Sequence, residues 1–188
     1  MVCFNGLLQW SGSRMKTSEN LRKPKENTGA PPAPLLFSLG FFKFSSVFIL
    51  LPDHWSRPLK QAIKSAEKQT SGEIRVHLEN QAKEDNLKHA QKVFHQVGMD
   101  QTELRNGVLF YLAVQDHQFS IIGDKGINEV TPDDFWDNIR NVMQDHFKKG
   151  AFVQGLVSGI GMAGEALKTY FPYQKDDTNE LPDQISKS

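Results

Sequence analysis

After residue 52, apolar positions first recur at the spacing of a helix and then alternate with polar positions as in a strand. A first helix is predicted because apolar side chains recur at three- and four-residue spacing, at Trp55, Leu59, Ile63 and Ala66. Residues 73–79 then alternate at every position, with apolar Ile74, Val76 and Leu78 between polar neighbours. This alternation predicts a strand with one buried face and one face exposed to water.

The next elements predict a parallel crossover followed by a hairpin. Apolar positions from Leu87 to Val97 indicate a second helix that ends at Gly98. Residues 107–114 contain no charged side chain, which is typical of a central strand buried on both faces. A polar connection at 115–118 leads to a second short strand at 119–122, which favours an antiparallel hairpin. The preceding helix fits a crossover between parallel strands.

Two helices are predicted in the last third of the chain. Thr131, followed by Pro132, has the residue types of a helix N-cap and first position, and Gly150 is typical of the end of that helix. A final helix extends from Phe152 to Phe171 and contains four glycines. Since glycine inside a helix is unfavourable, we expect these glycines to allow close packing on a neighbouring element.

The chain divides into three expected regions: an N-terminal extension at 1–52, one domain at 53–172 and an acidic flexible tail at 173–188. Composition predicts disorder up to Pro34. Residues 34–51 are apolar enough for a membrane anchor, which would place the domain outside the cytoplasm, but Lys43 in their middle is unfavourable in a bilayer. The alternative is a non-native extension. We favour the extension and a cytoplasmic protein.

Charge and cysteine content exclude several classes of site. Residues 1–52 carry 6 basic and 2 acidic side chains, whereas residues 53–188 carry 16 basic and 20 acidic ones. The predicted domain is therefore mildly acidic and has no basic stripe, so we expect no nucleic-acid partner. Cys3 is the only cysteine, which excludes an intramolecular disulfide and a cysteine-based zinc site.

Several motifs in order resemble the TPM domain family over about residues 55–172. They are Thr70-Ser-Gly-Glu-Ile-Arg-Val-His77, Arg105-Asn-Gly-Val-Leu109, Ile121-Ile-Gly-Asp-Lys-Gly-Ile127 and Phe147-Lys-Lys-Gly-Ala-Phe-Val-Gln-Gly-Leu156. The resemblance implies an α/β fold, a three-layer α/β/α sandwich with a small mixed sheet flanked by about four helices. It also implies a shallow acidic depression linked to divalent-metal binding and, in plant members, to acid phosphatase activity. Many members read Gly-x-Gly-Leu-Glu where this chain has a longer loop containing Asp124.

Three carboxylates are candidate ligands for calcium or magnesium, because these cations prefer oxygen ligands: Asp116, Asp124 and Glu129. We expect them to converge at one end of the sheet. Arg105, Asn106 and Lys125 are the candidates for binding a phosphate ester beside the metal. The alternative is that Asp116, Asp124 and Asn106 are turn residues, that Glu129 is a surface acid and that Arg105 pairs with one. No catalytic residue is identified.

Two functions remain open from the sequence. We favour a cation-binding regulatory or protein-interaction module with an unknown partner, because no nucleophile with a paired base is evident. The alternative is a metal-dependent phosphatase that acts on phosphomonoesters, so whether the protein is an enzyme stays open.

Overall fold

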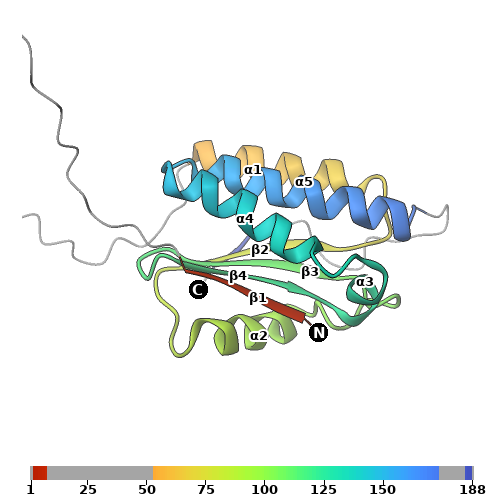
Figure 1. Ribbon diagram of the computed structural model, residues 1–188, viewed down its shortest axis with the longest axis horizontal. Coiled ribbons are helices and arrows are strands. Elements are labelled where there is room, and N and C mark those ends of the chain that lie inside the picture. The colour runs from red at the N-terminus through yellow and green to blue at the C-terminus, as the bar shows by residue number, and fades with distance from the viewer. Residues whose placement is uncertain (1, 8–52, 174–184, 188) are drawn as a thin grey trace, which may run out of the picture. The chain divides into compact units, whose positions relative to one another are not determined.

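The computed structural model describes residues 2–7, 53–173 and 185–187, which all belong to one compact unit. A five-stranded sheet runs through this unit in the order β1-β4-β3-β2-β5 (Figure 1). The strands are β1 (Val2–Leu7), β2 (Ile74–Glu79), β3 (Val108–Ala113), β4 (Gln118–Gly123) and β5 (Ser186–Lys187). The helices are α1 (Asp53–Glu67), α2 (Asn86–Gln96), α3 (Lys125–Val130), α4 (Phe135–Lys148) and α5 (Phe152–Tyr170).

The sheet is mixed, as predicted. Strand β2 pairs in parallel with β3, and β3 pairs antiparallel with β4 in a register that places Val108 opposite Gly123. Each residue of β3 is at most 2% exposed, because this strand is central and covered on both faces. The predicted parallel crossover, hairpin and central strand are therefore confirmed.

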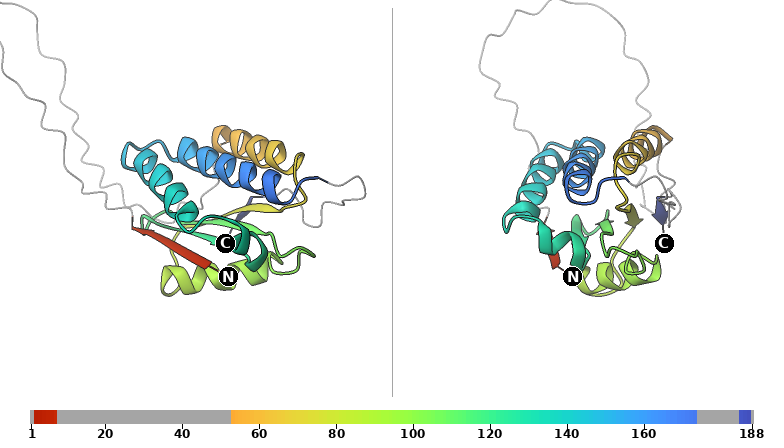
Figure 2. Two further views of the ribbon diagram at one scale, coloured as in Figure 1. Left: turned by 45° about the vertical axis from the view of Figure 1, so that its right-hand side comes forward. Right: turned by 90° about the vertical axis from the view of Figure 1, so that its right-hand side faces the viewer.

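Helices cover both faces of the sheet, so the α/β sandwich is confirmed (Figures 1 and 2). On one face α1, α4 and α5 pack over a core that includes Val76, Phe110 and Ile121. On the other face α2 packs over a second, smaller core that includes Leu109 and Ile122. Alternate residues of the central strands point to opposite cores, as strand geometry requires.

The glycines of α5 allow close contact with neighbouring elements at three of four positions. A Cβ atom at Gly155 would lie 2.5 Å from Phe147, one at Gly159 would lie 2.6 Å from Met143, and one at Gly164 would lie 2.7 Å from Ala66. The expectation of close packing is therefore confirmed at these positions. Gly161 differs, because a Cβ atom there would meet nothing within 4 Å.

The polar face of β2 is not exposed to water, so that part of the prediction is wrong. Glu73, Arg75, His77 and Glu79 are 4–8% exposed. Alternation along one strand predicts an exposed face, whereas burial depends on the elements packed over that strand. All six residues of β2 are buried.

The start of α4 and the loop before it also differ from the prediction. Residues after Asp124 form the short helix α3, and Thr131 is its C-cap. Helix α4 begins later, at Phe135, and its N-cap residue Asp134 makes no side-chain capping bond. Thr131 therefore ends one helix rather than beginning the next, and Pro132 lies in the connection between them.

Two strands belong to regions for which no regular structure was predicted. Strand β1 pairs antiparallel with β4, and β5 pairs in parallel with β2. The remaining parts of 1–52 and of 173–188, including the apolar segment 34–51, lie outside the described residues. Within the described ranges, no helix is long and apolar enough to cross a membrane.

We expect Gly123→Ala to lower the free energy of unfolding by about 1–3 kcal/mol, because overpacking of a rigid core is unfavourable. The new Cβ atom would lie 2.3 Å from the buried indole of Trp136. The matched control is Gly161→Ala, which should raise stability by up to about 1 kcal/mol through helix propensity. Urea unfolding of both variants tests this; equal effects would contradict the packing explanation.

Candidate functional site

One end of the sheet collects five of the six residues predicted to form a site, all except Asp116. Strands β2 and β3 begin at this end and β4 finishes there, because β2 and β3 are parallel and β4 is antiparallel to them. Arg105 and Asn106 precede β3, whereas Asp124 and Lys125 follow β4. The pairing of the strands therefore brings these residues to the same end.

Asp124 is a buried structural carboxylate at this end, with 1% of its surface exposed. Its oxygens accept hydrogen bonds from Arg105 Nε at 2.6 Å and Arg105 Nη2 at 3.0 Å. It also caps α3 by accepting a bond from the backbone N–H of Lys125 at 2.8 Å. The carboxylate thus holds the Arg105 guanidinium in a two-pronged pair and starts the following helix.

Arg105 adopts a backbone conformation that non-glycine residues rarely use, with φ of 52°. Its carbonyl accepts a hydrogen bond from the N–H of Gly126 at 2.8 Å. A Cβ atom at Gly126 would lie 2.2 Å from the Leu104 carbonyl oxygen, so this contact requires glycine. The hydrogen bonds from Arg105 to Asp124 raise the pKa of the guanidinium, which is half exposed at 52%.

Asn106 follows Arg105 in the chain and is 1% exposed. Its Nδ2 donates to the Ser71 carbonyl oxygen at 3.3 Å, and its backbone N–H donates to Thr102 Oγ1 at 3.2 Å. Asn106 Oδ1 and Ser71 Oγ are buried without a hydrogen-bond partner in the structure. Asn106 therefore joins the starts of β2 and β3 and does not point freely into solvent.

The three carboxylates predicted to bind a cation do not converge. Asp116 lies in the hairpin at the opposite end of β4 from Asp124, and six strand residues correspond to about 20 Å. Asp116 accepts a hydrogen bond from the backbone N–H of Ala82 at 2.7 Å. Glu129 is 61% exposed and pairs with Lys125 at 3.6 Å. In the described parts of the chain, no three His, Cys, Asp or Glu side chains are grouped to hold a metal.

A second polar group, which the sequence analysis missed, lies beneath α2. Glu79 is 4% exposed and accepts a hydrogen bond from Tyr111 Oη at 2.9 Å. Its carboxylate also lies 2.9 Å from His89 Nε2 and 3.3 Å from His77 Nε2. We call Glu79, His77, His89 and Tyr111 the buried polar cluster. Its residues come from β2, α2 and β3, so only the tertiary structure brings them together.

Burial sets the proton affinities in this cluster. Desolvation is the main effect that lowers the pKa of His77, although the neighbouring Glu79 opposes it. Burial and then the bond to Glu79 raise the pKa of Tyr111. The cluster therefore favours a neutral imidazole and a protonated phenol around one carboxylate. On its other side, His77 Nδ1 lies 2.7 Å from Ser186 Oγ of β5.

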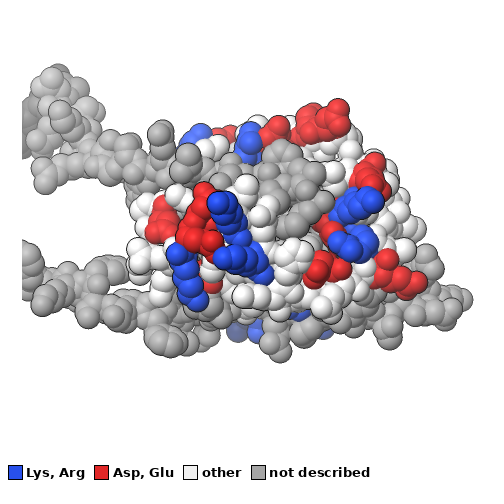
Figure 3. All heavy atoms as spheres, turned by 90° about the horizontal axis from the view of Figure 1, so that it is seen from below, with Lys and Arg blue, Asp and Glu red and all other residues white. Residues whose placement is uncertain are grey.

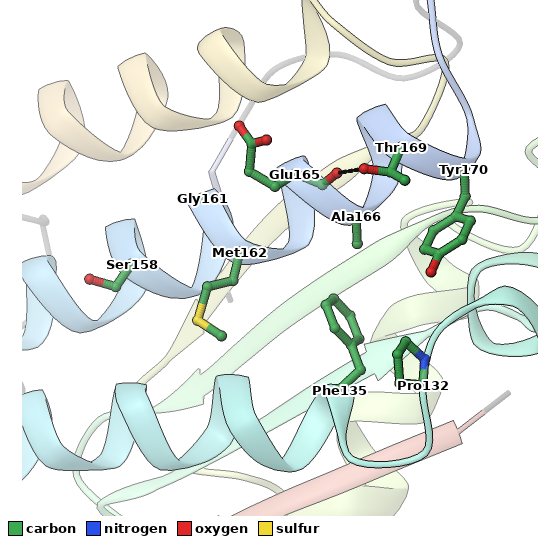
Figure 4. A pocket seen from close by; sticks show the side chains of 9 residues that line it. All are labelled: Pro132, Phe135, Ser158, Gly161, Met162, Glu165, Ala166, Thr169 and Tyr170. Carbon is green, nitrogen blue, oxygen red and sulfur yellow. Dashed lines mark hydrogen bonds between the residues drawn. The ribbon is translucent and has the colours of Figure 1, made fainter.

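An apolar groove of about 650 Å³ opens between the start of α4 and the second half of α5 (Figure 4). Phe135 lies on the α4 side, opposite Met162 and Ala166 of α5. Glu165 also lines the groove, with its carboxylate pointing away from Phe135 (Figure 4), and Gly161 leaves open space in the wall. The remaining lining residues are Pro132, Ser158, Thr169 and Tyr170. The groove offers a binding surface, and Ser158 Oγ on its wall lies 3.5 Å from His146 Nε2 of α4.

The face that carries α2 shows no large area of one charge (Figure 3). Basic and acidic side chains of the described residues lie next to one another on it. Lys92 of α2 pairs with Glu84, which precedes this helix. His95 and Asp100 form a second such pair at 2.8 Å. The described residues on this face therefore form no continuous basic surface.

We expect stability to fall as the pH drops below about 6.5, the ordinary pKa of histidine, because burial lowers the pKa of His77. The unfolded chain then binds a proton more tightly than the folded chain does, so acid favours unfolding. The loss is about 1.4 kcal/mol for each unit of pKa depression.

Urea unfolding between pH 8 and 5 checks this effect. His77→Gln should flatten the dependence on pH, whereas His117→Asn, at an exposed hairpin histidine, should leave it unchanged. Glu79, His89 and Arg75 also influence His77, so the slopes of the variants are compared rather than their absolute stabilities. Identical slopes for both variants would contradict the assignment to His77.

Comparisons with known proteins agree with the fold. The profile of the TPM domain matches residues 50–166. The NMR structure of BA42 protein from the psychrophilic bacterium Bizionia argentinensis is similar, with a TM-score of 0.70 and 53% sequence identity. The similarity covers 77% of this chain and 99% of that one. No curated protein matches significantly. The extent of the profile match and this identity show that the chain belongs to the TPM domain family.

Proposed function

We propose that this TPM domain protein is a non-catalytic interaction module that binds an amphipathic helix of a partner protein in the α4–α5 groove. The observation that carries the proposal is the open apolar groove itself, with a volume of about 650 Å³. Binding of an amphipathic helix in an apolar groove is a common mode of recognition.

The side chains in the groove suit protein recognition. Phe135 and Met162 supply apolar contact area, and the flexible thioether of methionine adapts to different partners. Tyr170 is 43% exposed at one end, and tyrosine is enriched at protein interfaces. Gly161 leaves room for an incoming side chain, because nothing lies within 4 Å of its Cβ position.

The partner helix is expected to be apolar on one face and basic beside it. Glu165 is the charged residue among those that line the groove. A lysine or arginine placed next to the apolar face of the partner would pair with this carboxylate, which gives orientation more than affinity.

A metal-dependent phosphatase remains the second candidate, and one observation favours it. Arg105, Asn106 and Lys125 lie together at the end of the sheet. There the positively charged side chains of Arg105 and Lys125 could bind the oxygens of a phosphate ester. A metal ion at this end would compete with Arg105 for Asp124, since both oxygens of that carboxylate already accept hydrogen bonds from the guanidinium. A calcium or magnesium ion could not bind Asp116, Asp124 and Glu129 together in this arrangement.

The groove is tested by NMR titration of the full chain with a designed Leu/Lys amphipathic helical peptide. We expect shifts centred on Gly161, Met162 and Ala166, and weaker binding of a Leu/Glu peptide because its acidic side chains would lie near Glu165. Met162→Asp should weaken binding at least tenfold by placing a charge against the apolar face of the peptide.

Leu104→Asp is the matched control for this titration, because Leu104 is an exposed apolar residue outside the groove, with 44% exposure. It should leave binding unchanged. Shifts spread evenly over the surface, or equal effects of both substitutions, would contradict the groove proposal.

The second candidate is tested by hydrolysis of p-nitrophenyl phosphate with added calcium or magnesium. A phosphatase at this end of the sheet would lose activity on chelation and in Arg105→Ala, but not in Arg57→Ala on exposed α1 surface. The carboxylates of Asp116 and Glu129 are too far apart to bind one cation together. If calcium or magnesium raises the melting temperature, we therefore expect that the rise does not require both residues. A rise abolished by Asp116→Asn and equally by Glu129→Gln would overturn that expectation.

A further inference from the structure

Strand β2 directs the backbone N–H and C=O groups of alternate residues toward β3 and those of the other residues toward its opposite edge. The carbonyls of Glu73 and Glu79 accept bonds from the β3 region, from Val108 N at 2.8 Å and Val114 N at 2.9 Å. Residues an even number of positions apart face the same neighbouring strand. The backbone groups of Ile74, Val76 and Leu78 therefore face the other edge.

Part of this edge is already capped by a side chain. The N–H of Ile74 donates to Glu67 Oε1, at the end of α1, over 3.0 Å. Glu67 thus stops strand pairing at the start of β2. The segment from Val76 to Leu78 is the part of the edge that can accept another strand.

Strand β5 occupies this part of the edge within the same chain. Its pairing is parallel and joins His77 to Ser186 and Leu78 to Lys187. Ser186 Oγ lies 2.7 Å from His77 Nδ1, on the side of the buried polar cluster. Ile185 packs against the opposite core, beneath α1 and α5. Ile185 therefore faces the apolar core on one side of the sheet, and Ser186 faces the buried polar cluster on the other side.

The contact is small for a strand. Among the described residues it covers two paired positions, whereas β2 and β3 pair over six. Exposed edges of sheets bind extended peptides through their backbone groups, and proteins commonly cover such edges. A two-residue strand is short enough to open without disturbing the pairing of β2 with β3.

We infer that the Val76–Leu78 edge of β2 is a strand-addition site, covered in the same chain by Ser186–Lys187. The partner it fits is an extended segment that runs parallel to β2 and carries an apolar residue followed by Ser or Thr. The apolar side chain takes the place of Ile185 and the hydroxyl takes the place of Ser186 at His77. This edge is separate from the α4–α5 groove, so the inference does not depend on the proposed function.

Hydrogen exchange of the full chain with Ser186→Pro tests the cover, because proline removes the backbone N–H at that position. The amides of Val76 and Leu78 should exchange at least tenfold faster, whereas those of His77 and Glu79, which face β3, should not change. A synthetic peptide with the sequence of residues 181–188 should restore protection and bind this variant at least tenfold more tightly than the unaltered chain. The same peptide with proline at its serine 186 position should not bind.

Two results would overturn the inference. One is equal exchange at Val76 and Leu78 in the variant and the unaltered chain. The other is failure of the peptide to bind once the edge has been freed. If the variant is too unstable to study, exchange in the unaltered chain decides: an edge that opens requires faster exchange at Val76 and Leu78 than at His77 and Glu79.

Discussion

The burial of β3 on both faces is the constraint on which the rest of the structure depends. Its residues are at most 2% exposed, so the sheet needs helices on both sides to exclude water. Helices α1, α4 and α5 supply one layer and α2 supplies the other. Because β3 is central, the polar chemistry of the domain lies at the ends of the strands, at the edges of the sheet or beneath α2.

The layer formed by α2 encloses charged and polar groups as well as apolar ones. A buried carboxylate is unfavourable unless hydrogen bonds or charges compensate it. Glu79 has such compensation, because Tyr111 donates to it and two histidines lie beside it. The same arrangement holds His77 against Ser186. The buried polar cluster therefore links the interior to the edge that β5 covers.

Asp124 and Arg105 show how a sequence motif can have a structural role. The carboxylate satisfies the guanidinium and the first amide of α3, and Gly126 allows the backbone of Arg105 to approach. Those bonds fix the loop that follows β4. An open apolar surface of the described domain lies instead between α4 and α5, and Glu165 is among the residues that line it.

The sequence by itself determined the order and type of the main elements, because apolar periodicity directly reflects which positions face a core, and its ordered motifs indicated the family by resemblance. It also placed Arg105, Asn106, Asp124 and Lys125 near one strand end, since local strand order is enough for that. It did not determine that β2 is buried on its polar face, because α2 and β5 cover it from distant positions. Nor did it separate Asp116 from Asp124, which follows from placing the hairpin and the end of β4 in space. The tertiary structure decided these points because burial and the convergence of side chains are properties of packed elements rather than of one segment.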